Sequence, residues 1–400
     1  MIDFELTEEH KILRDSVRQW AEGVKDRIVE LDRKHETDPE ILYDMGRQGF
    51  LGICIPEKYG GAGMDYISLA ILCEELERVD TSLRVPISVH VGLNSLTLLQ
   101  WANEEQKQKY LIPQAEGKKL AAFGLTEPNA GSDAKNIQTT AVKEGDYYII
   151  NGSKAWISLG DTADHIIIFA RTGPKELGHK SISAFIIERG YKGFSSQKIK
   201  GKLGVRAGDT SMMYFHDMAV PAENLLGEEG EGFKIAMSAL DNGRYTVGAG
   251  SVGLAKAAMD EAINYAKTRI AFGKPIAEFQ LIQQKIAYMV RGIESAELLI
   301  WKAGWMKNKG YRNTKETSLA KWHATDIAME VADMALQIFG AYGYSDEYPI
   351  ERFFRNARGA RIYEGTAEIH QLIQASYALG YRKDKPLRKE LPPWPFPDDV

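Results

Sequence analysis

The stretch RIYEGTAEIHQL, residues 361–372, places one carboxylate, Glu364, where the chain enters a helix. We expect Thr366 to cap that helix, because its side-chain oxygen can accept a hydrogen bond from a free first-turn N–H. An ionised acid beside a buried helix is costly unless something uses it, so Glu364 is a candidate functional residue. Three apolar residues follow at helical spacing and predict that the helix has a buried face: Ile369, Leu372 and Ile373.

The composition of the chain is that of an ordinary globular protein. It has 400 residues, of which 44% are hydrophobic and 26% charged, and this length predicts two or three domains. The formal net charge of −5 lacks the excess of positive charge that binds a polyanion, so nucleic acid is not an expected partner. Cys54 and Cys73 form no ligand cluster and predict a reducing compartment. The first ten residues do not resemble a signal peptide, and the longest aliphatic run, near 166–170, is too short to span a bilayer. We therefore expect a cytoplasmic protein that is not bound to a membrane.

The sequence changes texture along its length, which predicts an α+β fold with three domains. Residues 1–120 read mainly as amphipathic helices, and breaks are expected at 56–65 and around Pro86. Residues 121–228 hold short runs rich in Ile, Tyr, Phe and Val between turn residues, as in a small β-domain. Long helical patterns that should form a bundle fill 229–385, and a Pro-rich tail that should wrap a surface follows: 252–269, 279–306, 318–340 and the tail 386–400.

Several common motifs are absent or misplaced. GAGSVG, residues 248–253, matches the dinucleotide-binding pattern, but its flanks are helical where a strand is needed before it. Close packing of helices at small residues is the better interpretation. The eight histidines are scattered, and neither a P-loop nor a nucleophile elbow occurs, so we expect neither a metal site nor nucleophilic catalysis.

Two further stretches complete a constellation with Glu364. They are FGLTEPNAGSD at 123–133 and NGSKAWISLGDTAD at 151–164. Together, from about residue 5 to about residue 381, the chain resembles the acyl-CoA dehydrogenase family, and these stretches resemble its flavin-binding signatures. The resemblance implies an N-terminal helical domain, a middle β-barrel or β-sheet domain and a C-terminal four-helix bundle. It also implies FAD, an acyl-CoA substrate, an electron-transfer flavoprotein as the electron acceptor, and a homotetramer built as a dimer of dimers.

The resemblance assigns flavin contacts by position. Residues of the two signatures would line and stack on the ring, and residues of RIAFGKPIAEFQ and QIFGAYG would reach the FAD of a neighbouring subunit. Ser158 stands where the family often has Thr, and its hydroxyl preserves the role. The implied cofactor-binding residues are Phe123, Leu125, Thr126, Gly131, Ser132, Trp156, Ile157, Ser158, Arg269, Phe272, Gln280, Gln337, Gly340, Ala341, Thr366 and Glu368.

The resemblance also gives Glu364 its role. An α-proton beside a thioester is a weak acid, and an enclosed carboxylate has a raised pKa that brings it closer to the proton it must remove. Some members of the family carry the base on an earlier helix, and the matching residue here is Gly243, which cannot serve. Glu364 is therefore the expected base. The implied substrate-binding residues are Arg84, Ser132, Asp241, Arg244 and Tyr363, with Asp241 and Arg244 on the CoA side.

Arg84 points to the acyl group. It stands in ELERVDTSLRVPISVHVG, and glutaryl-CoA dehydrogenases carry an arginine at this point after the same ELERVD. There the arginine pairs with the far carboxylate of the substrate, and Glu77 could hold the guanidinium in an empty site. A glutaryl-CoA-like substrate is therefore the main expectation. Benzylsuccinyl-CoA is an alternative, since Gly92 could make room for a ring, and so is a short-chain, butyryl-type substrate.

Two other classes share the signatures. An acyl-CoA oxidase would pass electrons to oxygen, but such enzymes are usually longer. A non-catalytic homologue would not need an intact base. Taken singly, a core tryptophan, a solvated Arg269 or an acid favoured by a helix dipole would explain each residue, but their common order and spacing favour the dehydrogenase.

Overall fold

The computed structural model describes residues 4–397, and the chain begins as a layer of helices. Their positions follow the apolar periodicity of the sequence: Val17 of the first helix is buried, and Leu13 and Trp20 pack partly buried beside it. The helices are α1 (Glu8–Lys34), α2 (Pro39–Arg47), α3 (Tyr66–Val79), α4 (Thr81–Pro86), α5 (Leu96–Trp101), α6 (Glu104–Gln106) and α7 (Ile112–Ala115).

Pro86 does not break the helical path, contrary to the expectation from the sequence. The chain passes from α4 directly into a π-helix, Ile87–Ser95, and then into α5. Pro86 is the last residue of α4, and the helical path continues beyond it with the wider i→i+5 hydrogen bonds of the π-helix. The expected break at 56–65 is present and contains a 3₁₀ turn, Glu57–Tyr59. A second π-helical segment is Lys107–Leu111.

An eight-stranded sheet follows, as the short β-rich runs predicted. The central strands β4 and β5 are almost entirely buried and read as continuous apolar runs, because both faces of the sheet are covered there. The path is β6-β7-β3-β2-β4-β5-β8, and β1 pairs in parallel with β4. The strands are β1 (Ala121–Gly124), β2 (Thr140–Glu144), β3 (Tyr147–Ser158), β4 (His165–Arg171), β5 (Ile182–Glu188), β6 (Phe194–Lys198), β7 (Thr210–Pro221) and β8 (Leu225–Leu226).

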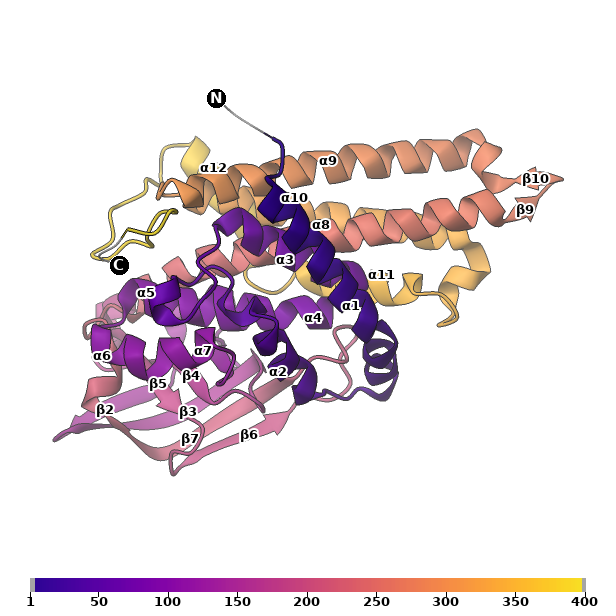
Figure 1. The fold of residues 1–400 in the computed structure, drawn as a ribbon. Coiled ribbons are helices and arrows are strands. Elements are labelled where there is room, and N and C mark those ends of the chain that lie inside the picture. Colours follow the sequence, from indigo (N-terminus) through magenta and orange to yellow (C-terminus); the bar gives the residue numbers. More distant parts are fainter. Residues whose placement is uncertain (1–3, 398–400) are drawn as a thin grey trace.

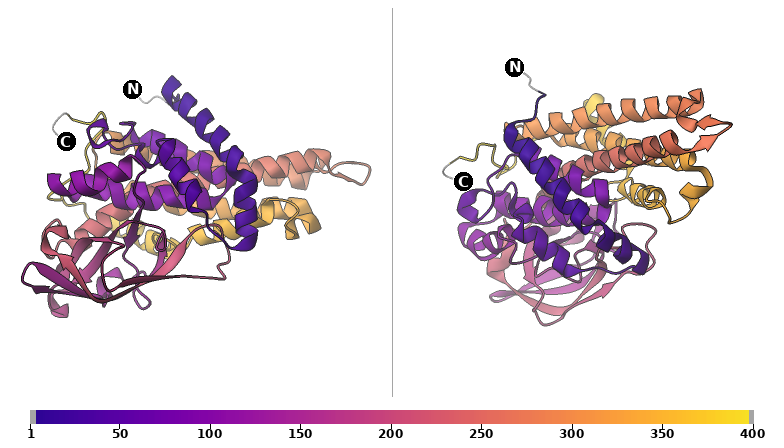
Figure 2. Two further views of the ribbon diagram at one scale, coloured as in Figure 1. Left: turned by 60° about the horizontal axis from the view of Figure 1, so that its bottom comes forward. Right: turned by 45° about the vertical axis from the view of Figure 1, so that its right-hand side comes forward.

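The C-terminal region is a helical bundle built on three long helices. Figure 1 shows them running past the sheet and projecting to one side, where a short hairpin of β9 (Ile270–Ala271) and β10 (Lys274–Pro275) forms the tip. The same projection is seen in both views of Figure 2. The helices are α8 (Gly232–Thr268), α9 (Gln280–Asn308), α10 (Thr314–Phe339), α11 (Ile350–Ala360) and α12 (Ala367–Ala378).

Helix α8 is the central helix of the bundle. It begins twenty residues before the predicted segment 252–269. It packs on α3, α9 and α10 and is buried along most of its length. The GAGSVG stretch lies in its middle, so the expectation of close helix packing is confirmed. A side chain at Gly253 would collide with the backbone of Glu74, and one at Gly248 would lie 2.6 Å from Ile300 Cδ1.

The tail returns across the N-terminal helices without forming a helix. Tyr66 donates its hydroxyl hydrogen to the carbonyl of Pro392 at 2.8 Å, and Gln100 donates to the carbonyl of Lys389 at 2.9 Å. The indole of Trp394 donates to the carbonyl of Gly63. The expectation that the Pro-rich segment wraps a surface is confirmed for 386–397, and its last three residues lie outside the described residues. No helix among residues 4–397 is long and apolar enough to cross a membrane.

Candidate active site

Glu364 sits in the turn that joins α11 to α12. Its φ of 54° is in the left-handed region, and Gly365 follows with φ 98°. The expected cap is present, because the side chain of Thr366 accepts a hydrogen bond from the N–H of Ile369 at 3.4 Å. One part of the predicted buried face is wrong: Leu372 is exposed, and the helix instead buries Ala367, His370 and Ile373.

The carboxylate of Glu364 points into the protein, over α8. A methyl group on Gly243 would overlap Oε2 of Glu364 and would lie 2.7 Å from Cδ2 of Leu93. Oε2 is buried and has no hydrogen-bond partner among the described residues. Burial raises the pKa of Glu364 to about 7, although the charges of Arg84, Lys321 and Arg244 act to lower it. The group therefore has the free lone pair and the basicity of a general base.

Arg84 lies beyond Glu364 and is fully buried in a polar cluster. Its Nε donates to Oε2 of Glu77 at 2.6 Å, its Nη1 to Oγ of Ser88 at 2.9 Å, and its Nη2 to the hydroxyl of Tyr363 at 2.8 Å. Burial alone would lower the pKa of Arg84, but the Glu77 carboxylate and the neighbouring Tyr363 together outweigh burial, and the pKa lies above its ordinary value. The expectation that Glu77 holds the guanidinium is confirmed.

The other side of Glu364 carries Arg244 and Asp241, both from α8. Arg244 Nε donates to the backbone carbonyl of Glu364 at 3.3 Å, and its Nη1 lies 3.5 Å from Oδ1 of Asp241. Asp241 also accepts a hydrogen bond from the hydroxyl of Thr314 at 2.6 Å. The predicted CoA-side residues therefore adjoin the predicted base.

The two flavin signatures are tied to each other at the end of β3. The N–H of Ala155 donates to the carbonyl of Thr126 at 2.9 Å, and the ammonium of buried Lys154 contacts Glu127 at 2.8 Å. A bulge follows Lys154, and Trp156 has a φ of 61° and is 62% exposed. Gly131 and Ser132 are exposed nearby in sequence, Thr126 and Ser158 are half-buried, and the side chains of Phe123, Leu125 and Ile157 are in the core. The last three could offer a ligand mainly their backbone groups.

The remaining predicted flavin contacts lie at the far end of the bundle. Arg269 ends α8 and sits over the ring of Tyr342 at 5.6 Å, and Phe272 at the hairpin is 96% exposed. Figure 1 places this end away from the sheet. Within one chain, the residues of the two flavin signatures and the predicted flavin contacts at the end of the bundle therefore do not meet. The exposed members of this second set are Arg269, Phe272, Gln280, Gln337, Gly340 and Ala341, whereas Thr366 and Glu368 stand at the start of α12 beside Glu364.

Three models of known domains match this chain in order. The acyl-CoA dehydrogenase N-terminal domain matches residues 7–118, the middle domain 122–218 and the C-terminal domain 230–379. The short-chain specific acyl-CoA dehydrogenase of Clostridium acetobutylicum is 46% identical over 93% of this chain and 98% of its own. The chain belongs to the acyl-CoA dehydrogenase family. It is an oxidoreductase acting on the CH–CH group of an acyl-CoA, and FAD is the cofactor of this family.

Two solved structures resemble this acyl-CoA dehydrogenase closely. One, from work on the electron transferring flavoprotein of Acidaminococcus fermentans, has a TM-score of 0.93 at 45% identity and covers 94% of this chain and 100% of its own. The other is a glutaryl-coenzyme A dehydrogenase in complex with glutaryl-CoA, with a TM-score of 0.93 at 38% identity, covering 97% and 99%. The relatives therefore include two of the three substrate classes that the sequence raised, the short-chain and the glutaryl class.

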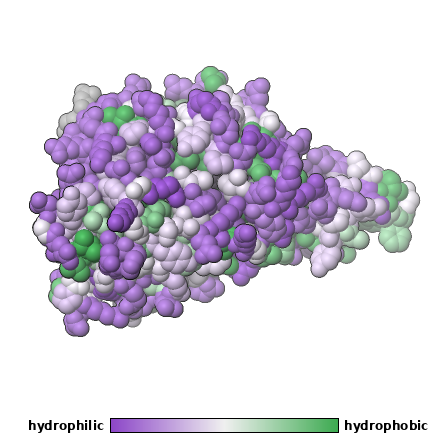
Figure 3. Space-filling view, turned by 90° about the horizontal axis from the view of Figure 1, so that it is seen from below, coloured by the Kyte–Doolittle hydropathy of each residue, from purple (hydrophilic) through white to green (hydrophobic). Residues whose placement is uncertain are grey.

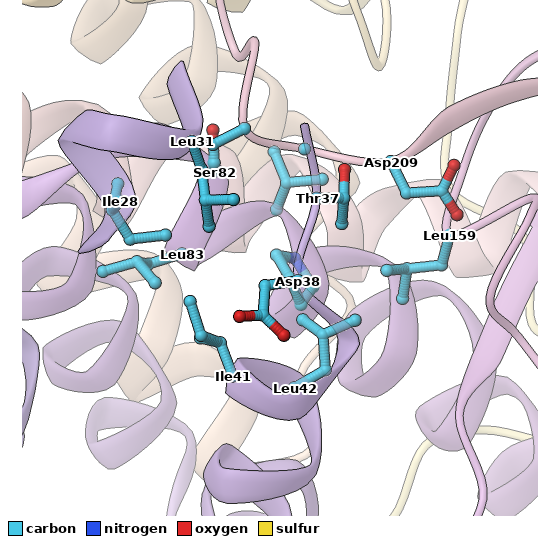
Figure 4. A pocket seen from close by; sticks show the side chains of 14 residues that line it. Ile28, Leu31, Thr37, Asp38, Ile41, Leu42, Ser82, Leu83, Leu159 and Asp209 are labelled. Carbon is cyan, nitrogen blue, oxygen red and sulfur yellow. The ribbon is translucent and has the colours of Figure 1, made fainter. Parts of the chain in front are cut away.

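A small cavity elsewhere in the dehydrogenase is not its active site. Figure 4 shows it between α1, α2, α4 and the turn after β3, with Ile28, Leu83 and Leu159 among its lining residues. Its volume of about 20 Å³ is enough for one water molecule but not for an acyl-CoA. It lies at the junction of the N-terminal helices and the sheet.

Sequence reasoning missed two lysines of the dehydrogenase. Lys154 links the two flavin signatures, and Lys321 of α10 donates to the carbonyl of Gly365 at 2.8 Å. Both are fully buried. The available signal was a lysine on an apolar face: Lys321 shares its side of α10 with Ala320, Ala324 and Ala328.

Proposed function

We propose that this dehydrogenase oxidises a short, unbranched acyl-CoA, and that Glu364 is the base. Glu364 removes the α-proton of the thioester as the β-hydrogen leaves with its electron pair as hydride, and a carbon–carbon double bond forms between the two carbons. FAD, when bound, supplies the hydride acceptor. Arg244 and Asp241 hold the CoA side, and Tyr363 borders the acyl side next to the base.

The observation that carries this proposal is the spacing of two features along α8. Glu364 rests on Gly243, and the Glu77–Arg84 pair rests on Gly250 on the same face, two helical turns or about 10 Å further along. Thr246, between them, accepts a hydrogen bond from Ser88 at 2.7 Å. A chain that passes the base therefore meets a buried ion pair after a few carbons. A longer aliphatic chain would have to displace charged groups that have no water to replace their contacts.

A substrate with a second carboxylate is the other candidate, and Arg84 favours it. The guanidinium lies close to the base, and a carboxylate is a good partner for it. However, Arg84 is not left unpaired without such a substrate, because Glu77, Ser88 and Tyr363 already engage its three nitrogens. The need for a second anion is therefore weaker than the sequence implied, and the short-chain relative supports the plain substrate.

An aromatic succinyl thioester has less support. A β-carbon added at Gly92 would already contact Thr246 at 3.4 Å and Asn242 at 3.6 Å, so α8 leaves room there for a methyl group but not for a ring.

The cofactor site also supports a proposed homotetramer. The exposed indole of Trp156 and the open Gly131 fit a flat ring system on one chain, and Gly131 has no atom within 4 Å of its Cβ position. The second set of predicted contacts stands on the far end of the bundle, where Figure 3 shows hydrophobic surface at the tip. We infer that this end reaches the FAD of a neighbouring subunit in a dimer of dimers.

The electron acceptor and location complete the proposal. An electron-transfer flavoprotein is the proposed acceptor, supported by the similarity to a structure from work on such a protein. A cytoplasmic location agrees with Cys54 and Cys73, which are both free and buried.

Anaerobic bleaching of the flavin tests the substrate. Purified enzyme is mixed with butyryl-, glutaryl-, benzylsuccinyl- and long-chain acyl-CoA in turn. We expect the highest kcat/KM with butyryl-CoA, a lower value with glutaryl-CoA and little reduction with the other two. A clear preference for glutaryl-CoA would make the second candidate the function. Rapid reoxidation by air instead of by the flavoprotein would identify an oxidase.

A further inference from the structure

Lys321 is a buried cation that holds the turn containing the base. It lies on α10, fully buried, where Gly248 of α8 allows the two backbones to approach: a Cβ on Gly248 would be 3.3 Å from the Lys321 α-carbon. Its ammonium donates to the carbonyl of Gly365 at 2.8 Å. No other hydrogen bond or ion pair of this ammonium occurs among the described residues. Its charge is therefore directed at the turn.

The turn is held from two sides. Arg244 of α8 donates to the carbonyl of Glu364, and Lys321 of α10 donates to the carbonyl of the next residue. Both residues of the turn have positive φ, which costs free energy for a non-glycine residue such as Glu364. Such a conformation persists only where surrounding groups fix it, and the two cations supply those contacts.

Charged and titratable groups from several elements face the carboxylate of Glu364. Arg84 comes from α4, Arg244 from α8 and Lys321 from α10, and all three act to lower its pKa. Cys73 of α3, Tyr363 beside the base and His370 of α12 stay neutral near pH 7, because burial raises the pKa of the first two and lowers that of His370 to about 2. Arg84 is paired with Glu77, and Arg244 lies beside Asp241. Lys321 forms no ion pair with a carboxylate among the described residues, although Asp326 on the same helix also acts on its charge.

We propose that Lys321 is a positioning residue of the dehydrogenase, which orients Glu364 through the Gly365 carbonyl and stabilises its ionised form. The inference rests on the proposed role of Glu364 as the base. It adds a residue that touches neither substrate nor flavin. Burial lowers the pKa of Lys321 to about 7, and the nearby Glu364 acts to raise it, so each group favours the charged form of the other.

Two substitutions separate the hydrogen bond from the charge. Lys321→Met removes both, whereas Lys321→Gln keeps a donor for the Gly365 carbonyl and removes only the charge. The matched control is Lys202→Met, since Lys202 donates to the carbonyl of Gly208 at 2.6 Å on the sheet side of the molecule. For each protein, the rate of anaerobic flavin reduction by butyryl-CoA is measured between pH 5.5 and 9. The pH at which the rate is half of its maximum is checked independently by the pH dependence of crotonyl-CoA binding, which is followed by flavin absorbance.

At low pH the rate of flavin reduction falls as the base is protonated, and we call this part of the pH profile the acid limb. We expect both variants to move the acid limb to higher pH by about half a unit or more, because the base loses a stabilising cation. The plateau rate should fall about tenfold or more in Lys321→Met through misplacement of the base, and Lys321→Gln should recover most of it. The control should leave the limb in place. An unshifted limb in Lys321→Gln overturns the proposal, whether or not Lys321→Met folds. If Glu364→Gln still bleached, the assignment of the base would fail instead, so the two failures can be told apart.

Discussion

Gly243 lies directly beneath the carboxylate of Glu364, and a methyl group at Gly243 would overlap the Oε2 atom. The glycine thus makes the space that the base occupies. The two positions are complementary, because Glu364 supplies the carboxylate and Gly243 leaves room for it.

Gly243→Ala should therefore displace Glu364 without removing it. We expect flavin reduction to fall by about a hundredfold, since a shift of about 1 Å in a catalytic group has that effect. FAD content should stay normal, because Gly243 is not among the residues expected to contact the flavin. Gly23→Ala is the matched control, since nothing lies within 4 Å of its Cβ position. Equal rates in the two variants would show that Glu364 does not need this space.

Removing Arg84 tests what limits the acyl group. Arg84→Gln leaves Glu77 buried without its cation, which should cost about 3–5 kcal/mol of stability. The double variant Glu77→Gln/Arg84→Gln removes both charges and should recover much of that loss in the free energy of unfolding. With the double variant, we expect kcat/KM for butyryl-CoA to change little and that for longer acyl chains to rise. A selective loss with glutaryl-CoA would instead assign Arg84 to the recognition of a second carboxylate.

The pH dependence follows from the raised pKa of Glu364, which burial brings to about 7. A base works in its deprotonated form, so kcat/KM should be full above this pKa and fall tenfold per unit below it. Stability should show the opposite trend, because the folded state holds the proton more tightly than the unfolded chain. The contribution of Glu364 to the free energy of unfolding is lost as pH rises from about 4.5 to 7, by about 3 kcal/mol in total. Glu364→Gln should therefore raise the melting temperature at pH 8 and not at pH 4.5. A melting temperature equal to that of the wild type at pH 8 would contradict the burial of the charge.

The far end of the bundle should carry the subunit contact. Phe272→Asp places a charge on a side chain that is 96% exposed in one chain, so it should cost the isolated fold little. If this end meets a neighbour and its FAD, the variant should sediment as a smaller species and lose FAD on dilution. Tyr214→Asp, on the exposed side of β7, is the control. A stable, yellow tetramer in the Phe272 variant would place the contact elsewhere.

The sequence predicted the elements with strong periodicity and missed features that depend on contacts between them. The runs at 165–172 and 181–189 became the buried strands β4 and β5, because apolar runs between turn residues have few other solutions. A break was expected around Pro86, but the chain continues from this residue directly into a π-helix. Leu372 has the right spacing for a buried face and is nevertheless exposed, because α12 turns His370 and Ile373 inward.

The site shows the same division. The flavin signatures and Glu364 could be recognised as short patterns, and Glu77 could be assigned to Arg84 because they lie seven residues apart on adjoining helices. Lys321 lies 43 residues before Glu364, and the packing of α10 against α11 and α12 brings it to the turn between those two helices. The apolar face around Lys321 is visible in the sequence, but its hydrogen-bond partner on a distant turn is not.

Stopped-flow reduction of Glu364→Gln by butyryl-CoA without oxygen tests the central claim most directly. The amide keeps the shape of the side chain and removes its basicity, so the variant should retain FAD and bind crotonyl-CoA as the wild type does. Its flavin should bleach at least about a thousandfold more slowly, as expected for the loss of a general base. Bleaching at a rate near that of the wild type would contradict Glu364 as the base.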